Sequence, residues 1–386
     1  MLSNMKSYGC FIRSVALALM CAGALLTSCS EKSLGPYDES ELDFYAAPPS
    51  GYNNLSALST ANCYILNQSG DYCIAAVKGN DSDGWLTTAK YAEVLWESFG
   101  TSTAPEVGDL IKSVSYKDGY IAFQTADTFK EGNAVIAAKD ESGDILWSWH
   151  IWMTDQPQEQ VYKNNAGTMM DRNLGATSET PGDVGALGLL YQWGRKDPFL
   201  NSTSIELRDR EAAASTITWP SVVPAYPWNG TIEYATANPT TLICVSYVEA
   251  NYDWYYASSS TLTDNTRWTD SNSAKSIYDP CPAGWRVPDG GPDGIWTCAG
   301  FNDVTFDDNC KGMSFNISSP SVTWYPASGE REFHDCSLDS VGWEGCYWSA
   351  YTTGIYAYTL YFNSLHLVPD NYSHRAEALA VRCAKE

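Results

Sequence analysis

The aromatic and polar side chains near the C-terminus are the residues best suited to recognise a ligand. Nine of the 33 residues from Trp343 to Arg375 are aromatic, about twice the 13% of the whole chain, and they are mixed with Ser, Thr, Asn, Asp and His. Tyrosine offers a large contact area with few rotors to freeze, and short polar side chains make adaptable hydrogen bonds. We therefore expect a ligand-binding surface made of Tyr351, Thr353, Tyr356, Thr359, Tyr361, Asn363, His366, Asp370, Tyr372 and His374.

A strand over residues 355–363 is expected to position the centre of this set. Side chains alternate between the two faces of a strand. We expect one face to be buried, with Tyr358, Leu360 and Phe362 on it. We expect the other face to be displayed, with Ala357, Thr359, Tyr361 and Asn363 on it. The alternative is that these aromatic residues fill a loop-rich core.

Catalysis is the second chemistry to weigh. The acid pairs Glu330 with Glu332 and Asp335 with Asp339 have the residue types of glycosidase carboxylates, but no motif surrounds them. With 46 acidic residues in the chain, chance pairs are expected. The chain has four histidines and no Cys-x-x-Cys pair, so zinc-ribbon and thioredoxin-type sites have no support. We predict that the protein is not an enzyme, with no cofactor and no metal, and keep a glycan-active hydrolase as an alternative.

Composition and charge set the wider limits. The chain has 386 residues, 44% of them hydrophobic and 18% charged, which is typical of a folded protein. Its length suggests about two domains. The formal net charge is -23, which repels phosphate backbones, so we expect no nucleic-acid partner.

The N-terminus has the features of an export signal. Lys6 and Arg13 are basic, residues 11–26 are apolar, and small residues precede Cys29. The run Leu26-Thr27-Ser28-Cys29 resembles a bacterial lipoprotein box, in which the cysteine is acylated. We therefore interpret 1–28 as a lipoprotein signal peptide, Cys29 as the lipidated residue and 29–55 as a tether. The lipid would be the only membrane contact, and we expect the protein on the outer membrane of a bacterium, at the cell surface. The alternative is an ordinary secretory signal.

Residues 56–155 are expected to form an all-β antiparallel sandwich of the immunoglobulin-like kind. Turn sequences separate most of seven short strand-like runs. These runs are residues 63–67, 72–77, 94–99, 111–116, 120–125, 134–138 and 145–153. Cys63 and Cys73 flank the first turn, so a cross-strand disulfide is one option there. We expect His150 to be hydrogen-bonded at a domain junction, with ligand contact as the alternative.

Residues 156–386 are expected to form a second, loop-rich domain. One helix is predicted over residues 183–193, where Val184, Leu187, Leu190 and Tyr191 lie near one face. Five short runs stand out in order along this region. They are Met170-Asp171-Arg172-Asn173-Leu174-Gly175, Tyr191-Gln192-Trp193-Gly194-Arg195, residues 279–288 from Asp-Pro-Cys-Pro to Arg-Val-Pro, Tyr347-Trp348-Ser349-Ala350, and Leu379-Ala380-Val381-Arg382-Cys383.

Together these runs resemble the Fibrobacter-type major paralogous domain, which is related to the C-type-lectin-like fold of the formylglycine-generating enzymes. The resemblance implies an α+β, C-type-lectin-like domain that displays variable side chains, and a disulfide between Cys281 and Cys383. We regard Asp171 and Arg172 as a structural pair, and Arg195 as a donor to loop carbonyls. Weaker disulfide options are Cys336 with Cys346 and Cys298 with Cys310, which would leave Cys244 free.

The N-terminal half resembles the modules that precede such domains in surface lipoproteins and fimbrial tip subunits. The C-terminal composition also resembles that of variable proteins diversified by retroelements. Calcium-dependent lectins carry a Trp-Asn-Asp run that is missing here, and residues 368–371 keep only a Pro-Asp remnant, so we expect no calcium-mediated binding. The leading hypothesis is a lipid-anchored adhesin for a glycan or protein ligand. The alternative is a structural pilus subunit, whose partners would be other subunits.

Overall fold

The computed structural model describes residues 47–386 except 207, 209, 219–220, 247–251, 257–263 and 302–303. The signal peptide, the lipidation site Cys29 and most of the tether therefore lie outside the described residues. The described part is rich in β-strands and loops, with two short α-helices. No helix in it has the length and apolar character needed to cross a membrane.

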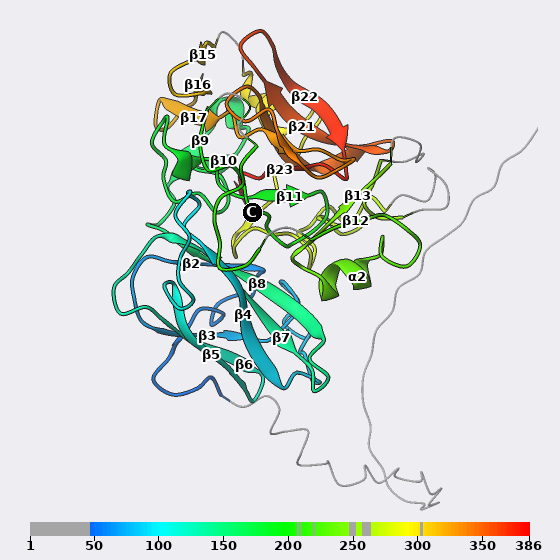
Figure 1. Cartoon of the computed structure of the whole chain (residues 1–386). Helices are drawn as coiled ribbons and strands as arrows, with labels where there is room; N and C mark the ends of the chain where they lie inside the picture. Colours follow the sequence, from blue (N-terminus) through cyan, green and yellow to red (C-terminus); the bar gives the residue numbers. More distant parts are fainter. Residues whose placement is uncertain are drawn as a thin grey trace, which may run out of the picture.

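The N-terminal part consists of two four-stranded sheets packed face to face, drawn in blue through cyan to green in Figure 1. One sheet has the order β1-β3-β6-β5 and the other β2-β8-β7-β4. Their strands are β1 (Asn53–Asn54), β2 (Cys63–Leu66), β3 (Asp71–Ala75), β4 (Tyr91–Ser98), β5 (Ile111–Lys117), β6 (Tyr120–Thr125), β7 (Gly132–Lys139) and β8 (Ile145–Met153). All seven predicted runs are strands, because turn residues separate segments rich in β-branched and aromatic side chains.

Two expectations about this part are wrong. The sheets are not purely antiparallel, since β1 pairs with β3, and β2 with β8, in parallel. Cys63 and Cys73 do not form a hairpin, because the chain crosses from one sheet to the other between β2 and β3. Both thiols are buried and free. In addition, β1 begins at Asn53, so the folded unit starts before the predicted boundary at 56.

The C-terminal part holds several small sheets and one sheet of seven strands. The large sheet has the order β19-β18-β23-β20-β21-β22, with β11 also paired to β23. Its strands are β11 (Leu190–Gln192), β18 (Glu330–Arg331), β19 (Leu338–Asp339), β20 (Gly345–Thr353), β21 (Tyr356–Phe362), β22 (Leu367–His374) and β23 (Ala378–Ala380). Figure 1 shows the orange and red β21–β22 hairpin at the end of the molecule farthest from the blue strands.

The remaining elements surround this sheet. They are β9 (Glu159–Val161), the 3-10 turn Lys163–Asn165, β10 (Thr168–Met170), the 3-10 turn Val184–Ala186, β12 (Ser221–Pro224), α2 (Ile232–Ala237), β13 (Thr241–Cys244), β14 (Trp285–Arg286), α3 (Ile295–Ala299), β15 (Phe306–Asp307), β16 (Gly312–Asn316), β17 (Val322–Pro326) and β24 (Ala384–Lys385).

The helix predicted over residues 183–193 is absent. This stretch holds a single 3-10 turn, and its end is strand β11. Gly182 and Gly188 have φ values of 86° and 70°, in the left-handed region that interrupts a right-handed helix. The apolar residues of this stretch do pack against the core, but they do so from a loop and a short strand and not from a helix.

The two parts share a continuous core. Cys63, Trp96 and Trp152 from the N-terminal part belong to the same buried cluster as Trp193 and Trp348 from the C-terminal part. His150 lies at this junction, 2% exposed, and its Nε2 shares a hydrogen bond of 2.9 Å with Asn133 Oδ1. Burial lowers the pKa of His150 to about 3, so it is neutral. The prediction of a hydrogen-bonded histidine at a domain junction is confirmed.

Two arginines also behave as predicted. Arg172 donates from Nε to Asp171 at 2.9 Å and is 2% exposed, so the two form a structural pair. Arg195 donates to the carbonyl oxygens of Thr241, Ala235 and Asn238. A single guanidinium thereby satisfies several acceptors of irregular backbone.

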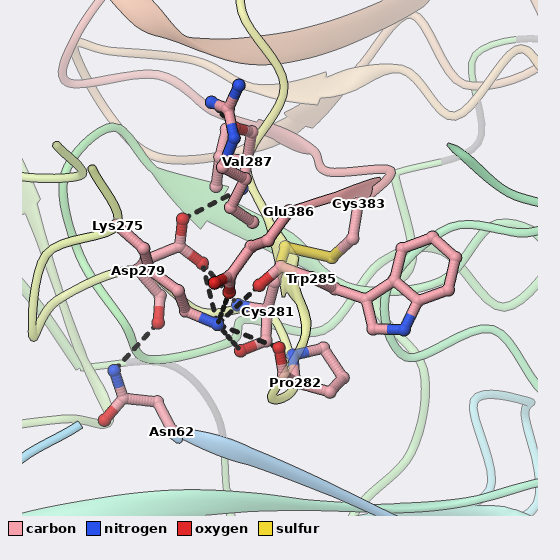
Figure 2. The surroundings of a disulfide bond; sticks show 10 residues. Asn62, Lys275, Asp279, Cys281, Pro282, Trp285, Val287, Cys383 and Glu386 are labelled. Carbon is pink, nitrogen blue, oxygen red and sulfur yellow. Dashed lines mark hydrogen bonds and ion pairs between the residues drawn. A yellow bond between two sulfur atoms is a disulfide. The ribbon is translucent and has the colours of Figure 1, made fainter. Parts of the chain in front are cut away.

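The disulfide between Cys281 and Cys383 is present and links two segments 102 residues apart. Figure 2 shows Lys275 pointing into the loop beside it, where Nζ donates to the carbonyl oxygens of Cys281 and Pro282 at 2.8 Å. Asn62 of the N-terminal part donates to the carbonyl of Asp279 at 2.8 Å. The disulfide loop therefore also contributes to the junction between the two parts.

Candidate functional site

Several of the predicted ligand-binding residues lie at one of the two opposite ends of the β21–β22 hairpin. Strand β22 is the edge of the large sheet, and its last residue pairs with the first residue of β21, in the register Tyr356 to His374. Thr353 pairs with Tyr356 across the preceding turn. Asn363 and His366 lie at the other end, where the hairpin turns.

Three rings gather where β22 ends, and we call Tyr356, Tyr372 and His374 the tyrosine–histidine face. The ring centroid of Tyr356 lies 5.0 Å from that of Tyr372 and 5.4 Å from that of His374. Tyr372 is 54% exposed, while Tyr356 and His374 are half-buried. An exposed aromatic surface of this kind, with polar groups on the same rings, is typical of recognition surfaces.

The His374 ring packs on two rings that are distant in sequence and is hydrogen-bonded to nearby Glu377. Its ring lies 4.5 Å from Phe333 and 4.6 Å from Tyr252, measured between centroids. Its Nδ1 shares a hydrogen bond of 2.9 Å with Glu377 Oε1. Burial lowers the pKa of His374, so the ring is neutral near pH 7. The imidazole thus has a fixed orientation and adds no positive charge to the face.

Arg375 fixes the turn that carries this face. Its Nη2 donates to the carbonyl of Gly354 at 2.9 Å and to Asn265 Oδ1 at 2.6 Å. Its Nη1 donates to the carbonyl of Asp264 at 3.1 Å. Gly354 has a φ of 58°, the left-handed conformation that a tight turn between β20 and β21 requires. The turn is therefore joined to the 264–265 segment through one guanidinium.

The Arg375 side chain itself is enclosed. Its guanidinium stacks 4.8 Å from the Trp193 ring and lies 3.6 Å from Asp253. Asp253 is also paired with Arg267, at 2.5 Å, and all three charged side chains are fully buried. A buried network of this kind is costly to break, because removing one member leaves the others unpaired. The tyrosine–histidine face therefore sits on a rigid base.

The expected division of faces on β21 is wrong. Thr359 is 1% exposed, Ala357 is fully buried and Asn363 is 6% exposed, although all three were expected to be displayed. Strand β21 lies between β20 and β22, and separate core clusters cover its two faces. Of the residues expected to be buried, Leu360 and Phe362 are, whereas Tyr358 is half-buried. A central strand covered on both sides has no displayed row.

Tyr361 and Asn363 take part in an internal network instead. Tyr361 donates its hydroxyl proton to Glu344 Oε1 at 2.6 Å, and Asn363 Nδ2 donates to the Tyr361 oxygen at 2.6 Å. Burial raises the pKa of the Tyr361 phenol, and the Glu344 carboxylate raises it further. Because Tyr361 and Asn363 are hydrogen-bonded inside the protein and Thr359 is buried, we no longer expect these three residues to contact a ligand.

The other predicted residues lie in different surroundings. His366 is exposed beside a cavity of about 540 Å³, a size in the range of small-molecule sites. Asp370 is exposed on edge strand β22, where a charge and the adjacent Pro369 discourage pairing with another chain. Tyr351 is half-buried against the shared core. The cavity is lined by Phe301, Val304, Thr305, Phe306, Asp308, Met313, Asn363, Ser364, Leu365, His366 and Leu367.

Acidic residues gather beneath the tyrosine–histidine face. Burial, with the nearby carboxylate of Glu332 as the next cause, raises the pKa of Glu377 to about 8. The pKa of Glu330 is also raised well above its ordinary value by burial and by Glu377. Among the described residues, no group of three or more His, Cys, Asp or Glu is arranged to hold a metal ion. Burial and mutual repulsion therefore favour the protonated form of these carboxyls.

Sequence reasoning missed Arg375, Glu377, Tyr252 and Phe333 as parts of this site. Arg375 ends the aromatic window, so its position was visible, but its partner Asp264 is 111 residues away in sequence. No local pattern joins them. Comparisons of the chain with family models, with curated proteins and with solved structures find no match.

Proposed function

We propose that the protein is a lipid-anchored binding protein of the bacterial cell surface, an adhesin that recognises a glycan through the tyrosine–histidine face. The anchor would be Cys29 in the outer membrane, and the sequence resemblance to the major paralogous domain supports a displayed recognition surface. The observation that carries the proposal is the exposed Tyr372 ring packed beside Tyr356, next to the turn that buried Arg375 holds in place.

A glycan suits this surface for two reasons. The apolar faces of sugar rings stack on tyrosine, and sugar hydroxyls pair with short polar groups such as Thr353 and with the phenol oxygens. A preorganised surface loses less entropy on binding, which matters for small, weakly binding ligands. Because the net charge is -23, we expect neutral glycans or amino sugars rather than sulfated ones.

A glycan binding screen with purified protein tests the proposal. We expect retention of a set of neutral or amino-sugar glycans, and loss of that retention in the double variant Tyr356→Ala/Tyr372→Ala. The matched control is Tyr91→Ala, because Tyr91 on β4 is 56% exposed and lies in the N-terminal part. Equal retention by all three proteins would place the glycan elsewhere and contradict the proposal.

Three alternatives give different results in the same material. A protein ligand would leave the glycan screen empty and would produce binding to host proteins that the double variant lacks. A structural pilus subunit would form ordered polymers without either ligand. Hydrolysis of a retained glycan would instead point to an enzyme, with Glu330 and Glu377 as the first residues to substitute.

A further inference from the structure

We propose that Cys244 and Cys336 are the site of a second disulfide, which ties strand β13 to the loop beneath the tyrosine–histidine face. The sequence alone allows a pair between Cys336 and Cys346, which would leave Cys244 free. The proposal goes beyond the proposed function and does not depend on it.

The backbone brings the two cysteines into one place. Val245, directly after Cys244, donates its N–H to the carbonyl of Phe333 at 2.7 Å. The Cys336 N–H donates to the carbonyl of Glu332 at 2.9 Å, which closes the loop from 332 to 336 beside β13. Cys244 packs against the same buried cluster that contains Cys336. The two thiols are close enough to share a hydrogen bond.

The alternative partner Cys346 is on the wrong face of the large sheet. Cys346 belongs to the core cluster shared with Trp348, whereas Cys336 belongs to the cluster that contains Tyr347. Neighbouring residues of β20 point to opposite faces, so the sheet itself separates Cys336 from Cys346. The predicted pair Cys298 and Cys310 is also unbonded in the structure.

The chemistry of the two thiols differs in a way that favours exchange. The hydrogen bond from Cys336 lowers the pKa of Cys244 to about 7, and Cys244 is only half-buried, so Cys244 is the more readily deprotonated and more accessible of the two thiols. Cys336 is 2% exposed, and its pKa is raised by that hydrogen bond and by burial. Cys244 is therefore the attacking thiol and Cys336 the resolving one.

The reaction needs a disulfide oxidant, such as oxidised glutathione or a disulfide-exchange enzyme of the export compartment. The Cys244 thiolate attacks one sulfur of that disulfide, forms a mixed disulfide and releases one thiolate. Cys336 then gives up its proton, attacks the Cys244 sulfur and releases the second thiolate. The protein loses two electrons and two protons, and the oxidant becomes two thiols.

The consequence is a cross-link at the base of the candidate site. Arg331 donates from Nη1 to the Cys336 carbonyl at 3.0 Å, and Phe333 of the same loop contacts the His374 ring. A bond between Cys244 and Cys336 would hold this loop against β13 even when the surrounding hydrogen bonds open.

The test is peptide mapping of the folded full-length protein after incubation with oxidised glutathione. Remaining thiols are blocked with a maleimide under denaturing conditions, and the digest is read by mass spectrometry. We expect a linked Cys244–Cys336 peptide and loss of maleimide from both residues. The linked peptide should be absent from Cys244→Ser and Cys336→Ser and retained in Cys298→Ser, the matched control.

Three results would overturn the proposal, namely maleimide on both residues after oxidation, a stable glutathione adduct on Cys244, or a peptide that links Cys244 to another cysteine. Since Cys336 is buried, Cys336→Ser could fail to fold. The wild-type digest alone then decides, and a thermal scan provides a second readout. After incubation with oxidised glutathione the wild-type protein should melt several degrees higher than the same protein before incubation. Cys244→Ser should show no such shift.

Discussion

The guanidinium of Arg375 donates to the carbonyl of Gly354, 2.9 Å away, at the tip of the turn between β20 and β21. This contact joins a buried charge network to the most exposed part of the candidate site. Arg375 directly follows His374, so one short segment supplies both a ring of the tyrosine–histidine face and its support. Rigidity of the turn is therefore a property of the site and can be tested.

Substitution of Arg375 by Met should destabilise the protein by about 3 kcal/mol or more. The change leaves Asp253 with one partner fewer and removes the donors to Gly354, Asn265 and Asp264. The measurement is the midpoint of urea unfolding. The matched control is Arg286→Met, because the Arg286 and Asp289 ion pair is partly exposed and should contribute only about 1 kcal/mol. Equal losses in the two variants would contradict the role given to Arg375.

Ionisation of Glu377 should lower the stability of the protein as the pH rises from about 4.5 to about 8. The folded-state pKa of Glu377 is about 8, above its ordinary value of 4.5. Its stabilising contribution is thus fully present below the unfolded pKa and is lost as the pH rises through the folded pKa. One such group contributes a slope of at most about 1.4 kcal/mol per pH unit. Glu330 shifts in the same direction and adds to the slope.

Urea unfolding between pH 4.5 and pH 8.5 measures this slope. Glu377→Gln should make it shallower, because the amide cannot ionise. Glu97→Gln would be an unsuitable control, because the Glu97 carboxylate accepts three backbone N–H hydrogen bonds that the substitution would disturb. Asp71→Asn, at an exposed residue of β3, is the better control and should leave the slope unchanged. His150 and His374 contribute with the opposite sign below pH 6.5, but they are present in both proteins, so the difference in stability between wild type and Glu377→Gln isolates Glu377. A difference that does not decline as the pH rises would refute the assignment.

Thr359→Val should leave stability unchanged or raise it by about 1 kcal/mol. The Thr359 hydroxyl is buried and has no hydrogen-bond partner among the described residues, so a methyl of similar size removes an unsatisfied polar group. Ligand binding should also be unchanged, since the residue lies inside the sheet. Thermal unfolding and a binding assay together check both statements. Loss of binding in a stable Thr359→Val protein would restore the earlier expectation of a displayed residue.

Cys383→Ser should cost about 2 to 5 kcal/mol, the usual effect of removing a native disulfide. The bond joins segments 102 residues apart and holds the loop that accepts hydrogen bonds from Lys275. Urea unfolding of Cys383→Ser, with Cys73→Ser as the control, measures the effect. Cys73 is buried but unpaired, so its substitution should have a smaller effect.

The sequence allowed the N-terminal strands to be predicted closely. Short apolar runs between turn sequences identify strands such as Tyr120–Thr125 regardless of which neighbours they pair with. Which strands pair with each other was not predictable, because β2 pairs in parallel with β8, the last strand of the N-terminal part. The same limit explains Cys63 and Cys73, whose symmetric spacing about Gln68 suggested a hairpin that the chain does not make.

The candidate site was predicted only in part, for a similar reason. Composition singled out the segment in which Tyr356, Tyr372 and His374 lie together. The alternation argument failed for Thr359, because it assumes one solvent-facing side and β21 has none. Arg375, Tyr252 and Phe333 were missed because only the folded chain brings them to His374 and Gly354.

Direct titration of a glycan from the screen into wild-type, Tyr372→Ala and Tyr91→Ala protein measures the central claim. Loss of an aromatic anchor at a recognition surface typically costs 2 kcal/mol or more, so we expect Tyr372→Ala to bind at least about 30-fold more weakly than wild type. Tyr91→Ala should bind as the wild type does, and both variants should unfold within about 0.5 kcal/mol of it. An unchanged dissociation constant for a folded Tyr372→Ala protein would contradict recognition at the tyrosine–histidine face.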